Sequence, residues 1–238
     1  MSSGLDGSVV VVSGGGGGIG TAVVADLRRH GARVAMLDVQ EGDADLSVRV
    51  DVTSDAEVRR ACATVRDRLG PVTHAVAAAG IVSEAPLDAL DPDIWHRTID
   101  VSLTGTYHLA RALLPAMAGR GGGALVAFSS GYATSGYRHG GHYAAAKAGV
   151  EALVKSLASE FGPAGVRVNA VAPGPVLTPM IDHIDDREQW RRDRETRIPL
   201  GRVATPDDIV GPVRFLLGDD SGYVTGQVLH VNGGLLMP

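Results

Sequence analysis

Five consecutive glycines, at positions 14–18, stand between a run of four valines and an amphipathic segment. The valines, residues 9–12, form the β-branched run that is typical of a strand buried on both faces. Residues 21–30 carry apolar side chains at helical spacing, and Gly31 is placed to end that helix. A flexible linker is disfavoured, because the segments on both sides need burial. We therefore interpret the glycine run as a shaped loop where a strand turns into a helix.

Strand and helix patterns alternate along the rest of the chain. A second strand at 33–37 ends at Asp38, and Ser54 with Glu57 fits a capping box that opens the next helix. We expect further strands at 48–52, 72–78, 124–128, 167–171 and 228–231, and helices around 100–118 and 143–161. Repeated β-α-β units pair their strands in parallel through right-handed crossovers. The sequence therefore predicts an α/β Rossmann fold, a single domain over 1–238 with a doubly wound parallel sheet and helices on both faces.

Composition limits the partners of such a domain. The 238 residues carry a formal net charge of −5, so no basic stripe is available to neutralise the phosphates of a nucleic acid or an anionic membrane. Cys62 is the only cysteine, which excludes an internal disulfide and a cysteine-based metal cluster, and we expect no metal site. No run approaches the ~20 apolar residues of a membrane span, and the N-terminus lacks a signal-peptide pattern. We therefore expect a cytoplasmic protein without a nucleic-acid or membrane partner.

The glycine loop satisfies two phosphate-binding patterns at once. Gly15, Gly17 and Gly20 fit G-x-G-x-x-G, while Gly14, Gly18 and Gly20 fit G-x-x-x-G-x-G. Where a strand turns into a helix, free backbone N–H groups and the positive helix end favour a pyrophosphate, and glycine lets the phosphate approach the backbone. The loop is therefore a candidate site for a dinucleotide cofactor.

Asp38 follows the second expected strand, 18 positions beyond Gly20. A carboxylate at this place accepts hydrogen bonds from the adenosine ribose hydroxyls and repels the 2′-phosphate of NADP. Residues 14–18 contain no Lys or Arg that would compensate for such a phosphate. We therefore expect the cofactor to be NAD, with NADP disfavoured.

Two side chains of the helix expected at 143–161 are suited to proton transfer. Tyr143 and Lys147 are four positions apart, so they share one face of that helix. A nearby ammonium favours the phenolate, which lowers the pKa of a tyrosine toward the range of a general acid/base. Hydride transfer to or from a carbonyl needs such a group, because a proton must move to or from the oxygen. Ser130, at the end of an expected strand, can hydrogen-bond the same oxygen.

Together these motifs resemble the short-chain dehydrogenase/reductase family over essentially the whole chain. Residues 13–20 match the family's T-G-x-x-x-G-I-G, with Ser13 in place of the threonine. Ser130, Tyr143 and Lys147 match its serine and its Y-x-x-x-K. The cofactor-binding positions that the resemblance implies are Ser13, Gly14, Gly17, Gly18, Ile19, Gly20, Asp38, Asp51, Val52, Ala78, Ala79, Gly80, Tyr143, Lys147, Pro173, Gly174, Val176 and Thr178.

The resemblance also implies a role for the reacting side chains. Tyr143 donates or takes the proton, Lys147 holds the nicotinamide ribose and lowers the Tyr143 pKa, and Ser130 orients the substrate oxygen. Residues 166–180 match the segment that binds the nicotinamide half of the cofactor. Within the glycine run, the family register leaves positions 15–17 variable.

Two positions depart from the family pattern. The family's N-N-A-G is A-A-A-G at residues 77–80, which lacks the side-chain amides that brace the sheet but keeps the backbone contacts to the adenosine side. The family's fourth catalytic member, an asparagine whose main-chain carbonyl helps to hold a water of the proton relay, is Ser102 here. A serine keeps the carbonyl and can bond back to its helix, so we expect a slower or altered relay at Ser102.

The substrate is the least constrained part of the prediction. The family sets it with a lid, here residues 178–200, and with the loop after Ser130. The lid carries charges of both signs, so the sequence indicates neither an acidic nor a basic substrate, and we interpret Trp190 within it as a packing residue. We expect interconversion of a small-molecule secondary alcohol and a ketone with NAD(H).

Two other hypotheses remain open at this point. The short stretch between Asp38 and Asp51 is similar to that of cyclic dihydrodiol dehydrogenases of the dihydroxybenzoate type. The departure at Ser102 is compatible with a dinucleotide-binding protein whose turnover is weakened or lost. The resemblance further implies a homotetramer or homodimer, formed through the helices around 100–118 and 143–161 and the last strand.

Overall fold

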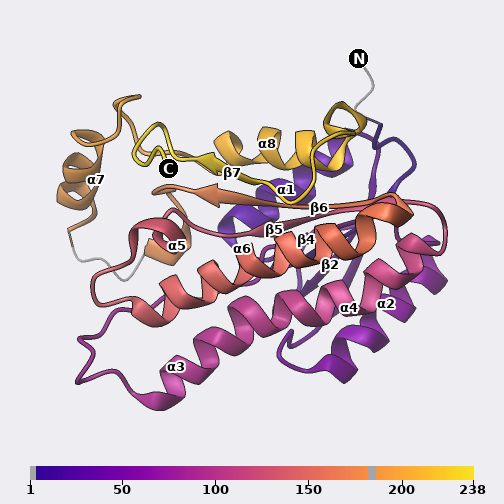
Figure 1. The fold of residues 1–238 in the computed structure, drawn as a ribbon, viewed down its shortest axis with the longest axis horizontal. Helices are drawn as coiled ribbons and strands as arrows, with labels where there is room; N and C mark the ends of the chain where they lie inside the picture. Colours follow the sequence, from indigo (N-terminus) through magenta and orange to yellow (C-terminus); the bar gives the residue numbers. More distant parts are fainter. Residues whose placement is uncertain (1–3, 182–185) are drawn as a thin grey trace.

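A single parallel sheet with helices on both faces forms the frame of the protein (Figure 1). The structure is a computed structural model that describes residues 4–181 and 186–238. Within these residues, seven strands follow the order β3-β2-β1-β4-β5-β6-β7, and each neighbouring pair is parallel. The strands are β1 (Val9–Ser13), β2 (Arg33–Asp38), β3 (Leu46–Arg49), β4 (His74–Ala77), β5 (Gly123–Phe128), β6 (Val166–Pro173) and β7 (Val228–Val231). The predicted doubly wound Rossmann fold is confirmed.

The valine run explains why the sheet needs helices on both faces. Val9 and Val11 pack into one hydrophobic cluster, while Val10 and Val12 pack into the other, because successive side chains of a strand point to opposite faces. All four are buried. The first face is covered by α2 (Asp55–Leu69), α4 (Gly105–Ala118) and α6 (Gly141–Phe161), and the second by α1 (Gly18–Arg29) and α8 (Asp207–Leu217).

Some elements begin or end away from their expected positions. Strand β3 ends at Arg49 instead of residue 52, because the chain turns at Asp51, whose carboxylate accepts the Thr53 N–H at 2.9 Å. The Ser54 side chain caps α2 by accepting the Glu57 N–H at 3.3 Å. The Glu57 carboxylate reaches back to the Asp51 N–H, at 3.0 Å, and not to that of Ser54 as a full capping box would require.

A longer, interrupted helix replaces the one expected at 100–118. It begins with α3 (Pro92–Ile99), which is capped by the Asp91 side chain. A π-helical turn, Asp100–Thr104, then joins α3 to α4, and the Gly105 N–H bonds to the Asp100 carbonyl five residues back. Such single turns insert one extra residue into a helix and are frequent at functional sites. Ser102 lies in this turn.

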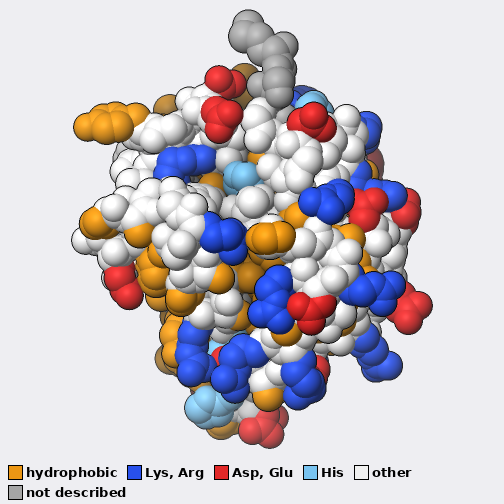
Figure 2. Space-filling view, turned by 90° about the vertical axis from the view of Figure 1, so that its right-hand side faces the viewer, with side chains coloured by type: hydrophobic (Ala, Val, Ile, Leu, Met, Phe, Trp, Pro, Cys, Tyr) orange, Lys and Arg blue, Asp and Glu red, His pale blue; other side chains and the backbone are white. Residues whose placement is uncertain are grey.

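The carboxyl ends of the strands open into the region between β1 and β4, where the strand order reverses. The chain runs from β1 to β2 on one side, and then crosses to β4 on the other. Such a switch point leaves a crevice outside the sheet in which ligands bind. Two shorter helices, α5 (Tyr132–Ser135) and α7 (Arg187–Glu195), lie at this end of the molecule (Figure 1). At the opposite end, Figure 2 shows basic and acidic side chains interspersed over the surface.

Candidate active site

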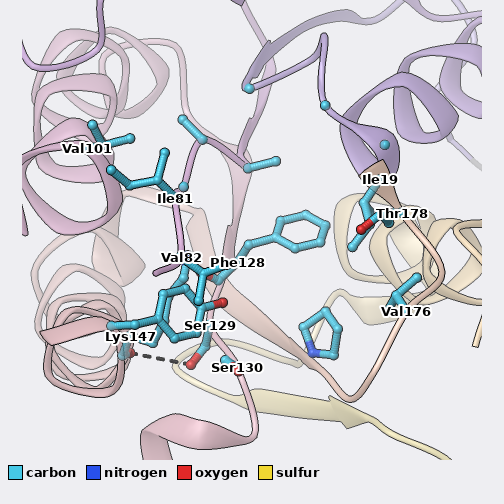
Figure 3. Close-up of a pocket in the computed structure, with 18 of the residues that line it drawn as sticks. Ile19, Ile81, Val82, Val101, Phe128, Ser129, Ser130, Lys147, Val176 and Thr178 are labelled. Atoms are coloured by element: carbon cyan, nitrogen blue, oxygen red, sulfur yellow. Dashed lines mark hydrogen bonds between the residues drawn. The ribbon is translucent and has the colours of Figure 1, made fainter. Parts of the chain in front are cut away.

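One large pocket, with a volume of about 1010 Å³, lies at the carboxyl ends of the strands. Most of the cofactor-binding and catalytic positions predicted from the sequence line it. Two of them do not: Ser13 and Ser102 are 2% and 0% exposed and lie behind the wall. Figure 3 shows Ser130 and Lys147 on one side of this pocket, across from Ile19, Val176 and Thr178. The expected lid, residues 178–200, includes residues 182–185, which lie outside the described part of the chain.

The glycine loop is held by backbone contacts that leave no room for side chains at its ends. Gly14 has a φ of +73°, and a Cβ there would lie 2.6 Å from the Ala79 Cα. A Cβ on Gly20 would collide with the Gly14 carbonyl, and one on Gly18 would lie 2.9 Å from Thr178 and Pro179. These three positions therefore require glycine, in agreement with the G-x-x-x-G-x-G register. Gly17 has only one neighbour, at 3.5 Å, and tolerates a Cβ.

Positions 15 and 16 are more constrained than the family register predicts. A Cβ on Gly15 would collide with the Met36 side chain, and one on Gly16 would lie 3.1 Å from the Asp38 carboxyl carbon. The Asp38 carboxylate accepts the Gly16 N–H at 3.0 Å through Oδ2 and the Gln40 N–H at 3.1 Å through Oδ1. The expectation that positions 15–17 vary freely is therefore wrong for 15 and 16, because these side chains of β2 lean over the loop.

The end of the pocket that is predicted to bind adenosine is built from three turns, which follow β1, β3 and β4. Asp51 accepts hydrogen bonds from the Thr53 N–H and hydroxyl, at 2.9 and 2.8 Å, and these bonds lower the pKa of its carboxyl. The Ala78 N–H bonds to the Ser13 carbonyl at 2.9 Å, which continues the sheet beyond β4. Ser13 thus positions the turn at residues 78–80 and, unlike its neighbours in the loop, does not face the cavity.

Ser130, Tyr143 and Lys147 meet at the other end of the pocket. The Ser130 side chain lies close enough to the Tyr143 hydroxyl to lower the pKa of that group. Lys147 Nζ lies 5.7 Å from the centroid of the Tyr143 ring and donates a hydrogen bond of 2.8 Å to the Phe128 carbonyl. Ser129, next to Ser130, donates to Glu151 at 2.6 Å, which fastens the end of β5 to α6.

The pKa values of this group differ from the sequence-based expectation. Burial raises the pKa of Tyr143 to about 12, and the Ser130 hydrogen bond opposes that shift. Burial also lowers the pKa of Lys147 to about 8. A tyrosine pKa lowered by the ammonium was expected, but in this structure the Lys147 ammonium bonds to the Phe128 carbonyl, and desolvation of the phenolate dominates.

Ser102 lies directly behind the Tyr143 and Lys147 pair. A Cβ built on Gly80 would be 3.2 Å from Lys147 Nζ and 3.6 Å from Ser102 Oγ, so both polar atoms approach the same point. Ser102 Oγ accepts the Ile81 N–H at 3.4 Å, and its carbonyl accepts the Thr106 hydroxyl at 3.1 Å. Ser102 therefore bonds forward along its helix through its carbonyl and to the turn after β4 through its side chain.

Several pocket residues carry no signal that the sequence interpretation used. Tyr132 and Tyr137 stack with ring centroids 3.9 Å apart, and Tyr137 meets the Tyr143 ring edge-on at 6.4 Å. The Tyr137 hydroxyl donates to the Glu84 carboxylate. Trp190, interpreted from the sequence as a packing residue, lines the pocket as well. Tyr132 and Tyr137 could have been found from the sequence, because they are spaced along the loop after Ser130, and that loop is expected to contact substrate.

Two further searches concern other kinds of site. No helix in residues 4–181 and 186–238 is both long enough and apolar enough to cross a membrane. In the same residues, no group of three His, Cys, Asp or Glu side chains is arranged to hold a metal ion.

Comparison with known proteins agrees with this geometry. Residues 14–236 match a family model described as enoyl-(acyl carrier protein) reductase. The chain is 40% identical over 237 residues to an acetoacetyl-CoA reductase of Synechocystis sp., covering 98% of each protein. It is 36% identical to a cis-4-hydroxycyclohexanecarboxylate dehydrogenase of Sinomonas cyclohexanicum, covering 95% of each.

A solved structure extends the likeness to three dimensions. A gluconate 5-dehydrogenase of Burkholderia cenocepacia, in complex with NADP and tartrate, superposes with a TM-score of 0.93 at 31% identity and covers 98% of this chain and 97% of its own. The family match and the relatives each span nearly all of the chain. The chain therefore belongs to the short-chain dehydrogenase/reductase family, oxidoreductases that use a nicotinamide dinucleotide.

Proposed function

We propose that this protein is an NAD(H)-dependent dehydrogenase/reductase that interconverts a secondary alcohol and a ketone. The observation that carries the proposal is the meeting of Ser130, Tyr143 and Lys147 at one end of a pocket whose other end is Asp38. A proton-transfer group and a ribose-binding carboxylate in one cavity are what hydride transfer with such a cofactor requires.

The residues present fit a dinucleotide. The glycine loop lines the pocket with its backbone, and it is held in this shape by close backbone contacts that leave no room for a Cβ at Gly14 or Gly20. Loop N–H groups at the start of α1 would hold the pyrophosphate, while Val176 and Thr178 would hold the carboxamide of the nicotinamide. When bound, the nicotinamide supplies or accepts the hydride.

The reacting side chains then divide the remaining work. The Tyr143 hydroxyl gives its proton to the ketone oxygen, and in the opposite direction the Tyr143 phenolate takes one from the alcohol. Ser130, whose side chain lies beside that hydroxyl, orients the substrate oxygen. Lys147 holds the nicotinamide ribose, and its charge favours the phenolate once the proton has left. Ser102 stands behind Lys147, and its main-chain carbonyl is the group that we propose for the proton relay.

Asp38 is the residue that favours NAD over NADP in this proposal. Two backbone N–H groups hold its carboxylate beside the loop, where a 2′-phosphate would meet a negative charge. The gluconate 5-dehydrogenase of B. cenocepacia was solved with NADP, so the family includes members that bind NADP.

A cyclic alcohol is the second candidate. The stacked rings of Tyr132 and Tyr137 offer a flat wall beside Tyr143, against which a ring can pack. The relative from S. cyclohexanicum is named for a substituted cyclohexanol. We therefore keep a cyclic dihydrodiol as the alternative substrate, and a dinucleotide-binding protein with weakened turnover as the alternative of another class.

The proposal is tested by NADH consumption against a panel of cyclic and aromatic ketones. The Tyr143→Phe variant should lose turnover while it still binds NADH, as followed by fluorescence. A variant that keeps the wild-type rate would show that Tyr143 is not the proton donor. A wild-type protein that binds NADH but reduces no ketone and oxidises no alcohol in the panel would favour the alternative without turnover.

We also propose a homodimer or homotetramer. Tyr107 on α4 is 45% exposed, Leu229 on β7 is 37% exposed and Tyr223 is fully exposed, which is unusual for large apolar side chains unless they are covered. Light scattering on the purified protein measures the mass directly. A monomer at micromolar concentration would contradict the proposal.

A further inference from the structure

The acidic side chains of helix α7 point away from the main pocket. Its acidic side chains pair along the helix surface: Glu188 with Arg191 at 3.1 Å and with Arg192 at 3.2 Å. Asp193 accepts a hydrogen bond from Gln189 at 2.6 Å, and Glu195 pairs with Arg191 at 3.6 Å. None of these three carboxylates lines the main pocket.

The face of α7 toward the pocket carries the opposite charge. Trp190 and Arg194, four residues apart, line the pocket together with Arg197 just beyond the helix. In residues 4–181 and 186–238, neither Arg194 nor Arg197 forms an ion pair with a carboxylate. From the sequence alone, the mixed charge of the lid indicates no charge for the substrate. In the structure, the lid presents two arginines to the cavity.

Arg194 is held in place before any ligand arrives. Its guanidinium lies over the Trp190 ring, 4.2 Å from the centroid, and Nη1 donates to the Trp190 carbonyl at 3.3 Å. A stacked guanidinium keeps its in-plane N–H groups free to meet an anion, and it loses less side-chain entropy on binding. The remaining N–H donors of Arg194 are therefore available to the pocket.

Tyr137 links the reacting end of the pocket to Arg194. Tyr137 contacts the Tyr143 ring edge-on, and the Arg194 charge acts electrostatically on the Tyr137 hydroxyl. Glu84 is the acidic group on this side, and its carboxylate already accepts the Tyr137 hydroxyl. The other acidic residues of the pocket lie toward the adenosine end or on α3 and the turn that follows it: Asp38, Asp51, Asp93 and Asp100. Among the residues that the structure describes, two arginines face one glutamate that is already hydrogen-bonded, and this corner of the pocket is therefore positive.

We infer that the substrate carries a carboxylate, bound by Arg194 and Arg197, which a ring or short chain separates from the reacting alcohol or ketone carbon. We infer the spacer from Tyr137, whose ring contacts Tyr143 edge-on and whose hydroxyl lies near Arg194, so that this side chain separates the reacting end from the arginine. A 2-hydroxy acid, whose two groups are adjacent, cannot reach both ends. The inference rests on the proposed oxidoreductase function and names the class of its substrate.

The test compares two ketones that differ only in charge, 4-oxocyclohexanecarboxylate and 4-oxocyclohexanecarboxamide, in NADH-dependent reduction. A charge-assisted bidentate contact should favour the carboxylate in kcat/KM by about tenfold or more. Arg194→Gln and Arg197→Gln should each bring that ratio toward one by raising KM for the carboxylate alone. Arg192→Gln, on the outer side of α7, is the matched control and should leave the ratio unchanged.

Each outcome separates this inference from the function on which it rests. Equal rates for both ketones, or a ratio that the Arg194 and Arg197 variants leave intact, overturn the anion site while the oxidoreductase function stands. If neither ketone is reduced, calorimetry of cyclohexanecarboxylate and cyclohexanecarboxamide binding to the NADH complex decides. Tighter binding of the carboxylate that is lost in Arg194→Gln supports the site, and equal binding overturns it.

Discussion

Lys147 Nζ donates a hydrogen bond of 2.8 Å to the Phe128 carbonyl, which joins the N-terminal part of α6 to the last residue of β5. The lysine is 3% exposed, so its side chain cannot exchange this partner for water. The contact keeps the nitrogen beneath the Tyr143 ring in the absence of cofactor. The folded protein therefore contains a buried amine, that of Lys147, whose pKa is lowered to about 8.

This pKa shift predicts how stability depends on pH. Between about pH 8 and pH 10.5 the unfolded chain retains a proton on Lys147 that the folded protein has already lost, so stability rises with pH in this window. Relative to Lys147→Met, the wild type should gain up to about 3 kcal/mol in the free energy of unfolding between pH 7 and pH 10.5. Urea unfolding at three pH values measures the gain. The exposed Lys155→Met variant on the same helix should track the wild type, and parallel pH curves for Lys147→Met would contradict the prediction.

Cofactor preference should follow Asp38. Asp38→Ser removes the charge that opposes a 2′-phosphate, so the ratio of kcat/KM for NADPH to that for NADH should rise by about tenfold or more. The exposed Glu41→Ser variant, three residues along and outside the pocket lining, should leave the ratio unchanged. A wild type that already prefers NADPH in direct competition would rule out the role given to Asp38.

Two glycines of the loop should respond differently to the same substitution. Gly20→Ala drives a Cβ into the Gly14 carbonyl, and we expect a loss of roughly 1–3 kcal/mol of stability together with weaker NADH binding. Gly17→Ala meets only the Gly14 carbonyl at 3.5 Å and should change stability by no more than about 0.5 kcal/mol. Thermal unfolding and NADH fluorescence titration report both quantities. Equal effects of the two substitutions would show that the loop is not held as described.

The relay position can be probed by restoring the family residue. If Ser102 acts through its main-chain carbonyl, Ser102→Asn should keep or raise kcat, because the carbonyl is retained. Thr104→Asn, in the same π-helical turn, controls for disturbance of the helix. A loss in kcat of about 100-fold or more, the scale of a proton-transfer group, would instead assign a function to the serine hydroxyl. The pH profile of kcat separates this from a structural defect, which would leave the profile unmoved.

The sequence predicts the sheet well because buried parallel strands leave a direct signature. Val9 to Val12 alternate between two cores, and few other structures use a β-branched run in this way. The π-helical turn around Ser102 is missed, since one extra residue only shifts the phase of the apolar pattern and leaves the segments on both sides helical. Helix α3 was likewise absent from the expectation, although Asp91 and Pro92 are a cap and first-turn pair.

The site is predicted unevenly, for a comparable reason. Gly14, Tyr143 and Lys147 are found because their chemistry demands fixed spacing along one loop or one helix. The contacts of Gly15 with Met36, and of Arg194 with Trp190, join side chains whose directions depend on the tertiary structure. The direction of the Tyr143 pKa shift is also beyond sequence reasoning, because the degree of burial decides it.

The hydrogen bond from the Gly16 N–H to Asp38 makes a change of cofactor preference depend on the order of mutations. A basic side chain introduced at position 16 while Asp38 is present must displace the carboxylate from its donor, so that variant would bind either dinucleotide poorly. Replacing Asp38 first opens the space that such a side chain needs. If the chain prefers NAD as proposed, a change of preference to NADP should therefore begin at position 38 and reach the loop only afterwards.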